Sequence, residues 1–444
     1  MSSTAASDAS KPSTALLTDH YELTMLQAAL HSGAAHRRTV FEVFARHLPH
    51  GRRYGVVAGT GRFLDALECF RFGPAELEFL RDAGIVNEQT LGYLESYRFS
   101  GDIWGYAEGD CYFPGSPILV VQASFAEAVV LETLALSILN HDCAIASAAS
   151  RMVTAADGRP LIEMGSRRTH ERAAVASARA AYIAGFGTTS NLQARQEYGV
   201  PSGGTSAHAF TLLHDSERHA FATQLESLGH GTTLLVDTFD VPRAVRTAVQ
   251  LTGGELGAVR IDSGDLPHVA REVRALLDEL GATKTRIVLT GDLDEFSIAA
   301  LTAAPVDGYG VGTSLVTGSG APTAALVYKL VARADTKDSG GALRPMAKRS
   351  VGKPGRGGRK WAVRHRDSDG TARTELITLA EPDLGPNDRA LLHPLVRDGE
   401  IIGGQSAQAA RERHRDALAE LPHHARQLSR GDPAIPTVFV PDSD

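Results

Sequence analysis

One pattern repeats through residues 233–314: a short apolar run, a small polar or acidic motif, and then residues with helical spacing. The motifs begin at Asp237, Asp262, Gly291 and Gly310, so they are 25, 29 and 19 residues apart. A strand and a crossover helix occupy such a length, and parallel strands need this kind of crossover. The repeat therefore predicts parallel strands that form a β/α barrel or an open α/β sheet, with ligands at the carboxyl ends of the strands.

Apolar runs of strand length and stretches with helical spacing locate the elements around this repeat. The expected strands are residues 161–164, 233–236, 258–261, 286–290 and 306–309, and the expected helices include 126–149 and 190–198. The helix at 126–149 is expected to be buried between domains. Asp215 is expected to cap a further helix.

The first part of the chain predicts a mixed α+β domain. A helix begins near Asp19, with Glu22 three residues later as in a capping box, and Gly33 ends it. Further elements are expected at 40–44, 74–80, 88–97 and 101–122. We expect four parts: a disordered tail (1–15), an N-terminal α+β domain (16–125), an α/β barrel domain with the active site (126–330), and a C-terminal segment (331–444) that partly completes the N-terminal domain.

The composition excludes several classes of partner. A net charge of −7 and a pI of about 6.2 give no electrostatic case for nucleic acid, and no apolar run is long enough to span a membrane. The first residues lack the apolar core of a signal peptide. Only three cysteines occur, without a CxxC motif, which fits a reduced cytoplasm and predicts no cysteine zinc site.

A glycine-rich stretch at residues 201–210 carries the candidate reactive group. Gly203 and Gly204 let the backbone approach a ligand closely, and Thr205 offers a hydroxyl to anionic oxygens. His208 follows and can act as acid, base or nucleophile near neutral pH. Taken alone, the stretch is typical of a polar turn with a surface histidine, but the neighbouring motifs favour a site.

The other strand-end motifs supply complementary groups. The turn at 310–314 offers backbone N–H groups and hydroxyls to a phosphate monoester. Asp262 and Asp265 flank the Ser263 hydroxyl and can hold ribose hydroxyls directly or through Mg²⁺. The remaining candidates are Gly291 and Asp292 in the same pocket, Arg167, Arg168 and Arg260 for a carboxylate or phosphate, and Tyr21 for stacking on an aromatic ring. This set suits a phosphorylated sugar together with an anionic ring.

The segment at 344–366 contains nine Lys and Arg residues and no acid. A solvated basic hairpin and a phosphate-attracting rim fit this charge equally well. Residues 375–402 are expected to form short strands that complete the first domain's sheet, and residues 407–418 an arginine-rich surface helix.

Five motifs, in this order, resemble the signature blocks of the nicotinate phosphoribosyltransferases. They are residues 16–25, 165–168, 204–208, 260–266 and 310–314, and the resemblance runs from about residue 16 to about residue 360. It implies an irregular β/α barrel plus an α+β domain built from N-terminal and C-terminal segments. It also implies a cytoplasmic homodimer whose sites lie near the subunit boundary.

Members of this family join nicotinate to 5-phosphoribosyl 1-diphosphate, form nicotinate mononucleotide and diphosphate for NAD biosynthesis, and couple the reaction to ATP hydrolysis. The resemblance implies that ATP phosphorylates His208, that Mg²⁺ is a cofactor without assigned ligands, and that Asp262 faces the ribose with Asp265 as a second catalytic carboxylate. The implied substrate-binding residues are Arg260, Thr205 and Arg167 for nicotinate, Gly312 and Thr313 for the 5-phosphate, Ser263, Gly291 and Asp292 elsewhere in the pocket, and Tyr21, from the same or a neighbouring subunit, over the pyridine ring.

Other functions stay open at this point. The same fold acts on nicotinamide or quinolinate in related enzymes, and a non-catalytic phosphosugar-binding protein is the rival from another class. The histidine block disfavours quinolinate, and an intact His208 with paired aspartates disfavours a pure binding protein. An arginine opposite the ring carboxylate favours nicotinate over its amide, because an unpaired buried guanidinium is costly.

Overall fold

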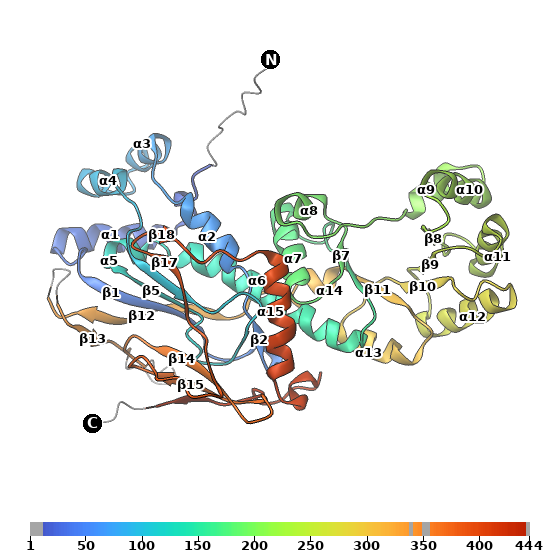
Figure 1. Cartoon of the computed structure of the whole chain (residues 1–444). Coiled ribbons are helices and arrows are strands. Elements are labelled where there is room, and N and C mark those ends of the chain that lie inside the picture. The colour runs from blue at the N-terminus through green and yellow to red at the C-terminus, as the bar shows by residue number, and fades with distance from the viewer. Residues whose placement is uncertain (1–11, 337–340, 349–355, 441–444) are drawn as a thin grey trace, which may run out of the picture.

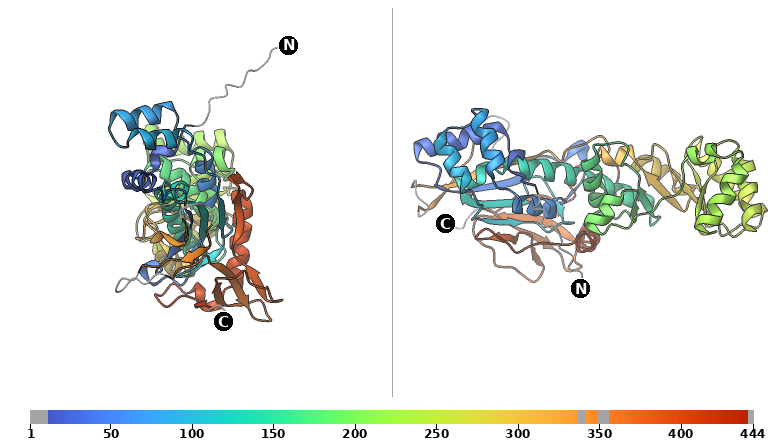
Figure 2. Two further views of the ribbon diagram at one scale, coloured as in Figure 1. Left: turned by 90° about the vertical axis from the view of Figure 1, so that its left-hand side faces the viewer. Right: turned by 90° about the horizontal axis from the view of Figure 1, so that it is seen from above.

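The computed structural model describes residues 12–336, 341–348 and 356–440 as a sheet-rich body that continues into a narrower α/β part (Figures 1 and 2). The body is built on a seven-stranded antiparallel sheet. In spatial order its strands are β13 Leu343–Pro345, β12 Leu326–Ala334, β1 Arg38–Ala45, β5 Leu119–Ser124, β3 Asp102–Gly105, β17 His393–Arg397 and β18 Glu400–Ile401. Strands from the beginning and the end of the chain therefore pair directly.

Helices and two small sheets complete the body. The helices are α1 His20–Ser32, α2 Thr60–Glu68, α3 Pro74–Asp82, α4 Glu88–Glu95 and α5 Phe125–Val129. One small sheet pairs β2 Gly55–Val56 with β4 Cys111–Tyr112, and the other contains, in order, β16 Asp388–Ala390, β14 Trp361–Arg366, β15 Ala372–Thr378 and β19 Thr437–Phe439.

The start of α1 differs from the sequence prediction. The Asp19 side chain makes no capping hydrogen bond. Glu22 is buried and accepts hydrogen bonds from Thr18 Oγ1 (2.5 Å) and from the backbone N of Thr133 (2.9 Å). The predicted capping box is wrong, because the Glu22 carboxylate instead contacts Thr133, which belongs to a helix far away in the sequence. Gly33 ends α1 in the left-handed conformation, as predicted (φ 74°).

A long helix, α6 Glu132–Ala156, joins the body to the α/β part (Figure 1). Its first half packs into the body's core through residues such as Leu134 and Ile138. Its second half packs into the α/β core through residues such as Ile145 and Met152. The predicted buried helix is confirmed, although it begins later than expected because α5 is a separate helix.

The α/β part contains six strands, all parallel. In spatial order they are β7 Thr188–Thr189, β6 Leu161–Glu163, β11 Gly308–Val311, β10 Arg286–Leu289, β9 Ala258–Ile261 and β8 Thr233–Leu235. The predicted parallel strands are confirmed, with the last beginning two residues later than expected. In the described part of the chain β7 and β8 do not pair with each other, so the curled sheet is an incomplete barrel.

Helices of 4 to 14 residues follow the strands of this sheet. They are α7 Glu171–Ile183, α8 Leu192–Tyr198, α9 His208–Leu213, α10 Glu217–Leu228, α11 Val241–Thr252, α12 Leu266–Glu279, α13 Glu295–Ala300 and α14 Thr313–Val316. Asp240, Asp265 and Asp294 each accept a hydrogen bond from a backbone N–H of the helix that follows. Part of the acidic repeat therefore serves helix capping. Ser216, not Asp215, caps α10, so that prediction is wrong.

The C-terminal helix α15 Ala407–Glu420 is an amphipathic surface helix, as the sequence predicts, and its inner face is buried against the rest of the chain. Arg411 donates hydrogen bonds to the carbonyl groups of Tyr182 in the last turn of α7 and of Gly185 and Phe186 just after it. His414 on the same helix is buried between Gly109 O and Ser150 Oγ, and burial lowers its pKa to about 4. Helix α15 therefore fixes the body against the α/β part.

The described part of the basic segment is divided: Arg344, Lys348 and Arg356 are exposed, as a solvated hairpin would have them, whereas two other cations fit neither sequence interpretation. Lys360 pairs with Glu42 at 2.7 Å, and Arg364 pairs with Glu375 at 2.8 Å, with all four side chains buried. These cations hold β14 and its neighbours inside the fold. Residues 349–355 of the segment lie outside the described residues.

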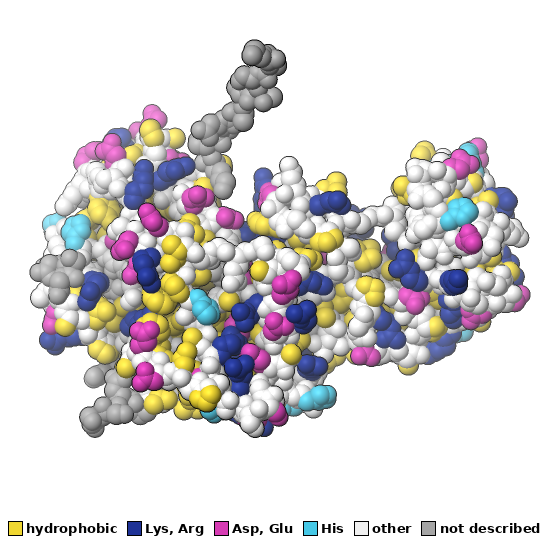
Figure 3. All heavy atoms as spheres, in the orientation of Figure 1, with side chains coloured by type: hydrophobic (Ala, Val, Ile, Leu, Met, Phe, Trp, Pro, Cys, Tyr) yellow, Lys and Arg dark blue, Asp and Glu magenta, His cyan; other side chains and the backbone are white. Residues whose placement is uncertain are grey.

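At the start of the chain, the expected tail at 1–15 is only partly described. Residues 1–11 lie outside the description, whereas Ala15 is buried and Ser13 Oγ donates a hydrogen bond to Arg71 O (2.6 Å). Residues 13–15 therefore pack on the body, against expectation. On the face in Figure 3, acidic and basic side chains are interspersed. No helix in the described ranges is long and apolar enough to cross a membrane.

Candidate functional site

The predicted histidine lies at the carboxyl edge of the parallel sheet, beside the end of β8. His208 is the first residue of α9, and its side chain is 42% exposed. Its Nδ1 lies 3.1 Å from Thr238 Oγ1, and its Nε2 lies 3.9 Å from Asp237 Oδ1. Both ring nitrogens therefore face polar groups of the β8 loop, while part of the ring stays accessible to a ligand.

Asp237 is a site residue that the sequence reasoning missed. Its side chain is 2% exposed, and its Oδ2 accepts hydrogen bonds from the backbone N of Asp262 (2.9 Å) and from Ser263 Oγ (2.6 Å). The other oxygen, Oδ1, faces His208 and is buried without a hydrogen-bond partner. One carboxylate thus holds the β9 loop and presents negative charge to the histidine. The available signal was its position directly after a strand, the same position as Asp262.

Arg260 and Thr205 meet as predicted for an anion site. Arg260 Nη1 donates a hydrogen bond to Thr205 Oγ1 at 2.6 Å, which joins β9 to the loop before His208. Arg260 Nε is buried without a partner. Burial lowers the pKa of Arg260, nearby Asp262 and Asp237 raise it, and the positive charge of Arg167 lowers it further. Two arginines therefore share this region, and a carboxylate would relieve their repulsion.

The predicted sugar pocket is a cavity of about 530 Å³ beside the ends of β9 and β10. Asp262, Ser263, Gly264, Asp265, Gly291 and Asp292 are among its lining residues. Asp262 accepts a hydrogen bond from Thr290 Oγ1. Gly291 has φ 129°, and a Cβ there would lie 3.2 Å from Asp262 O, so only glycine fits well.

Asp265 has a different environment from Asp262. It accepts a hydrogen bond from the backbone N of His268 (3.1 Å) as the N-cap of α12. Asp262, Asp265 and Asp292 are all exposed at the pocket, and Asp265 differs from the other two in that one of its oxygens is engaged as a helix cap. No group of three or more His, Cys, Asp or Glu side chains in the described ranges is arranged to hold a metal ion.

The end of β11, where the predicted glycine turn begins, is packed tightly against its neighbours. A Cβ at Gly310 would lie 2.6 Å from Thr290 Cγ2 and 2.7 Å from Met164 Sδ. Thr313 follows at the exposed start of α14. The segment at 310–314, which begins inside β11, therefore adjoins both the β10 loop and the β6 loop that carries Arg167.

Tyr21 is the one predicted residue that the fold does not bring to this edge. It lies on α1, at the opposite end of the molecule from α9 (Figure 1). The side chain is 44% exposed, and burial together with Glu132 raises its pKa. A ring stacked by Tyr21 near His208 therefore needs a second copy of the chain.

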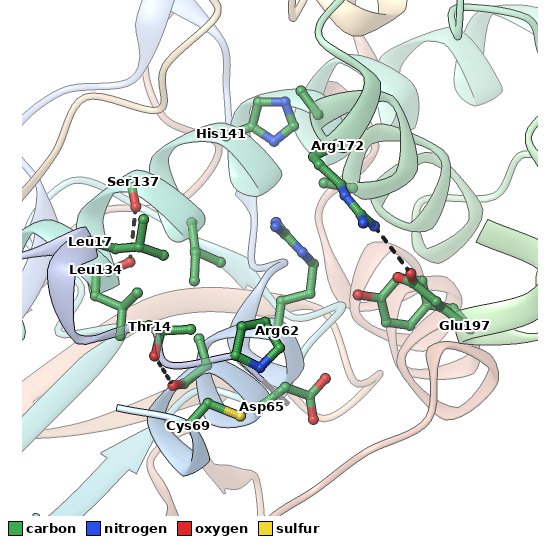
Figure 4. A pocket seen from close by; sticks show the side chains of 16 residues that line it. Thr14, Leu17, Arg62, Asp65, Cys69, Leu134, Ser137, His141, Arg172 and Glu197 are labelled. Carbon is green, nitrogen blue, oxygen red and sulfur yellow. Dashed lines mark hydrogen bonds and ion pairs between the residues drawn. The ribbon is translucent and has the colours of Figure 1, made fainter. Parts of the chain in front are cut away.

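A separate cleft of about 850 Å³ lies between α2, α6, α7 and α8 (Figure 4). Arg62, His141 and Arg172 line it, and Arg172 lies 3.6 Å from Glu197 across it. None of the residues predicted for the site lines this cleft. The carboxyl edge of the sheet therefore remains the candidate site.

Comparisons with known proteins agree on one family. Residues 16–140 match the model of the nicotinate phosphoribosyltransferase N-terminal domain. A nicotinate phosphoribosyltransferase of Mycobacterium tuberculosis is 59% identical over 436 residues, covering 96% of this chain and 95% of that protein. The Bacillus subtilis enzyme is 36% identical over 330 residues, covering 72% and 67%.

A solved structure shares the fold. The structure of human nicotinic acid phosphoribosyltransferase superposes with a TM-score of 0.81 at 23% identity, covering 96% of this chain and 97% of that one. At this identity the structural match supports only the fold, that is, the arrangement of the body and the incomplete barrel. The comparison of activity rests on the sequence relatives.

Proposed function

The chain belongs to the nicotinate phosphoribosyltransferase family, and we propose that it couples this activity to ATP through phosphorylation of His208. The observation that carries the activity is the 59% identity over 96% of the chain. The protein is accordingly a nicotinate phosphoribosyltransferase that acts in NAD biosynthesis. The phosphoribosyl donor, the ATP coupling and the residue roles are proposals, and the contacts at the carboxyl edge support them.

The proposed transfer forms one bond and breaks one. The pyridine nitrogen of nicotinate attacks C1 of 5-phosphoribosyl 1-diphosphate, and diphosphate leaves with the electrons of the C1–O bond. The enzyme's main task is to hold the two reactants in line and to stabilise the leaving anion. Arg260 with Thr205 would hold the ring carboxylate, Thr313 and Gly312 the 5-phosphate, and Asp262 the ribose, with Ser263, Gly291 and Asp292 around the sugar.

ATP would act through His208. The γ-phosphoryl group passes to a ring nitrogen and leaves ADP, and water later releases phosphate from the histidine. Asp237 lies 3.9 Å from the ring and would stabilise its positive charge during transfer. A phosphorylated His208 would add a dianion beside Arg260 and Arg167 and so change how the loops hold substrate.

Mg²⁺ fits this site as an ion that is bound together with phosphate groups. Proteins commonly hold it through one or two carboxylates plus substrate phosphates. Asp262, Asp265 and Asp292 are exposed carboxylates of the pocket, and Asp265 uses one oxygen as a helix cap, so Asp262 and Asp292 are the first candidates. When bound, Mg²⁺ would neutralise charge on the diphosphate.

The proposed function is tested by measuring nicotinate mononucleotide and ADP after mixing the protein with nicotinate, 5-phosphoribosyl 1-diphosphate and Mg²⁺, with and without ATP. We expect product that ATP stimulates, with nicotinamide and quinolinate as poor substitutes. Efficient use of nicotinamide would favour the amide-specific alternative. No product from any ring, with the sugar diphosphate still bound, would favour the non-catalytic binding protein.

Asp237→Asn tests the role of the missed carboxylate. The amide oxygen keeps the hydrogen bonds to Asp262 N and Ser263 Oγ, but the charge facing His208 is removed. We expect ATP hydrolysis to fall by about 10²-fold, the scale of one positioned acid–base group. Transfer without ATP should change little. A matched variant, Asp240→Asn, alters only the cap of α11. Equal losses in both variants would contradict the role of Asp237.

We infer a homodimer in a reducing cytoplasm, with Tyr21 of a second copy covering the site. Support comes from the exposed side chains of Tyr21, His208 and Phe239, and from the three cysteines, which are free and buried. Mixing equal amounts of unfolded Tyr21→Ala and His208→Ala chains and refolding them should restore about a quarter of the ATP-stimulated activity, because half the dimers then carry one intact site. No recovery, with mixed dimers demonstrated by mass, would place Tyr21 outside the shared site.

A further inference from the structure

Glu163 is a buried carboxylate at the end of β6, and the proposed mechanism does not use it. It is 1% exposed. Its Oε1 accepts a hydrogen bond from the backbone N of Gly165, and its Oε2 accepts one from Thr189 Oγ1. Burial raises the pKa of Glu163, and these two hydrogen bonds lower it. Breaking either hydrogen bond is costly in free energy, because it leaves a buried polar group without a partner and with its full desolvation penalty.

The first hydrogen bond holds the arginine loop, which we define as residues 165–168. Gly165 begins this loop, and a Cβ there would lie 2.1 Å from Val316 Cγ1, so the loop packs directly on α14. Within the loop, Ser166 Oγ accepts a hydrogen bond from Asn191 Nδ2 at 3.0 Å. The position of Gly165 therefore affects both Arg167 and the turn at 310–314.

The second hydrogen bond holds the histidine loop, defined as residues 201–208. Thr189 is fully buried, its backbone N donates to Pro201 O (2.9 Å), and its backbone O accepts from Gly203 N (3.0 Å). The Thr189 side chain thus links Glu163 to the backbone that leads to Thr205 and His208. Glu163 and Thr189 form a short buried path between the two loops.

We propose that Glu163 and Thr189 are positioning residues that couple the arginine loop to the histidine loop. The inference rests on the proposed function, in which one loop contacts nicotinate and the other carries the histidine that ATP phosphorylates. A shift of the histidine loop on phosphorylation is transmitted through Thr189 and Glu163 to Gly165 and so to Arg167. The path supplies a physical route by which ATP alters substrate binding.

Three threonine variants separate this role from general stability. Thr189→Val keeps the shape but removes the hydroxyl, Thr189→Ser restores a hydroxyl, and Thr285→Val is the matched control. Thr285 is also buried, and its Oγ1 donates to Leu256 O (3.0 Å) at the amino end of the sheet, away from both loops. Glu163→Gln provides a second route if Thr189→Val does not fold.

Hydrogen exchange of the ligand-free proteins tests the coupling without any assay of activity. In Thr189→Val we expect exchange at Gly165 and at Gly203 to rise by about tenfold, because loss of the hydroxyl leaves Glu163 Oε2 without its donor. Thr189→Ser should return both rates towards wild type, and Thr285→Val should change neither. Faster exchange in the histidine loop alone, with Gly165 unchanged, overturns the proposed path.

The activity readout is the ratio of kcat/KM for nicotinate with and without ATP. We expect Thr189→Val and Glu163→Gln to bring this ratio close to one while ATP hydrolysis and basal transfer persist, with recovery in Thr189→Ser. An unchanged ratio in Thr189→Val contradicts the coupling. If the wild-type protein itself shows no ATP stimulation, the proposed function fails, and the exchange result alone decides whether the two loops are coupled.

Discussion

His208→Ala is expected to abolish ATP hydrolysis and the stimulation of transfer by ATP, while a slow ATP-independent transfer remains. The alanine has no nucleophile for the γ-phosphoryl group, so the loss of hydrolysis should exceed about 10³-fold. Of the groups proposed to hold nicotinate and the sugar diphosphate, Arg260 and Asp262 lie on another segment. Thr205 shares the histidine loop with His208, but its hydrogen bond from Arg260 (2.6 Å) holds it in place. Steady-state assays of ADP and of nicotinate mononucleotide on the same samples measure both effects.

A second histidine, at the C-terminal end of the same helix, provides the control for this variant. His214 follows α9, and its Nδ1 lies 2.8 Å from Phe210 O, so it stabilises the helix end without facing the site. His214→Ala should keep ATP-stimulated transfer. Loss of all transfer in His208→Ala with hydrolysis intact would show that the histidine serves the sugar or the ring and not ATP.

Arg260→Ala is expected to raise the KM for nicotinate by about 10²-fold, the scale of a charge-assisted pair of hydrogen bonds. The KM for 5-phosphoribosyl 1-diphosphate should change far less, because the proposed phosphate turn at 310–314 is on another strand. Without the guanidinium the preference for nicotinate over nicotinamide should shrink as well. Arg260→Lys should recover little, because an ammonium cannot reproduce the planar fork.

Arg286→Ala is the matched control for Arg260. Arg286 begins β10, the strand next to β9, but it lies at the amino end of the sheet and is exposed. Its replacement should leave both KM values unchanged. Equal rises in the two KM values for Arg260→Ala, accompanied by loss of the Thr205 contact, would indicate a structural arginine.

Much of the α/β part was predictable because its signals are local. Apolar runs located β9 and β10 within a residue. Consecutive parallel strands place the polar residues at their carboxyl ends along one edge of the sheet, whether or not the barrel closes. His208, Thr205 and Arg260 could be placed together for the same reason. The family resemblance supplied their roles, which local signals alone do not specify.

The features that were missed depend on partners far away in the sequence. Glu22 was assigned to a cap, but its hydrogen bonds reach Thr133, and the Lys360 side chain pairs with Glu42. Acidic residues after strands were ambiguous as well. Asp237 faces the histidine while Asp265 caps a helix, and the proline two residues after Asp265 was the available signal of a helix start.

The most direct test of the central claim is to incubate the protein with γ-labelled ATP and Mg²⁺ and to locate the label by peptide mapping under conditions that preserve phosphohistidine. We predict acid-labile, base-stable label on the peptide that contains His208, absent from His208→Ala and discharged when nicotinate and 5-phosphoribosyl 1-diphosphate are added. Label on a different residue, or ATP-stimulated transfer without any labelled protein intermediate, would contradict phosphorylation of His208 as the step that couples ATP to transfer.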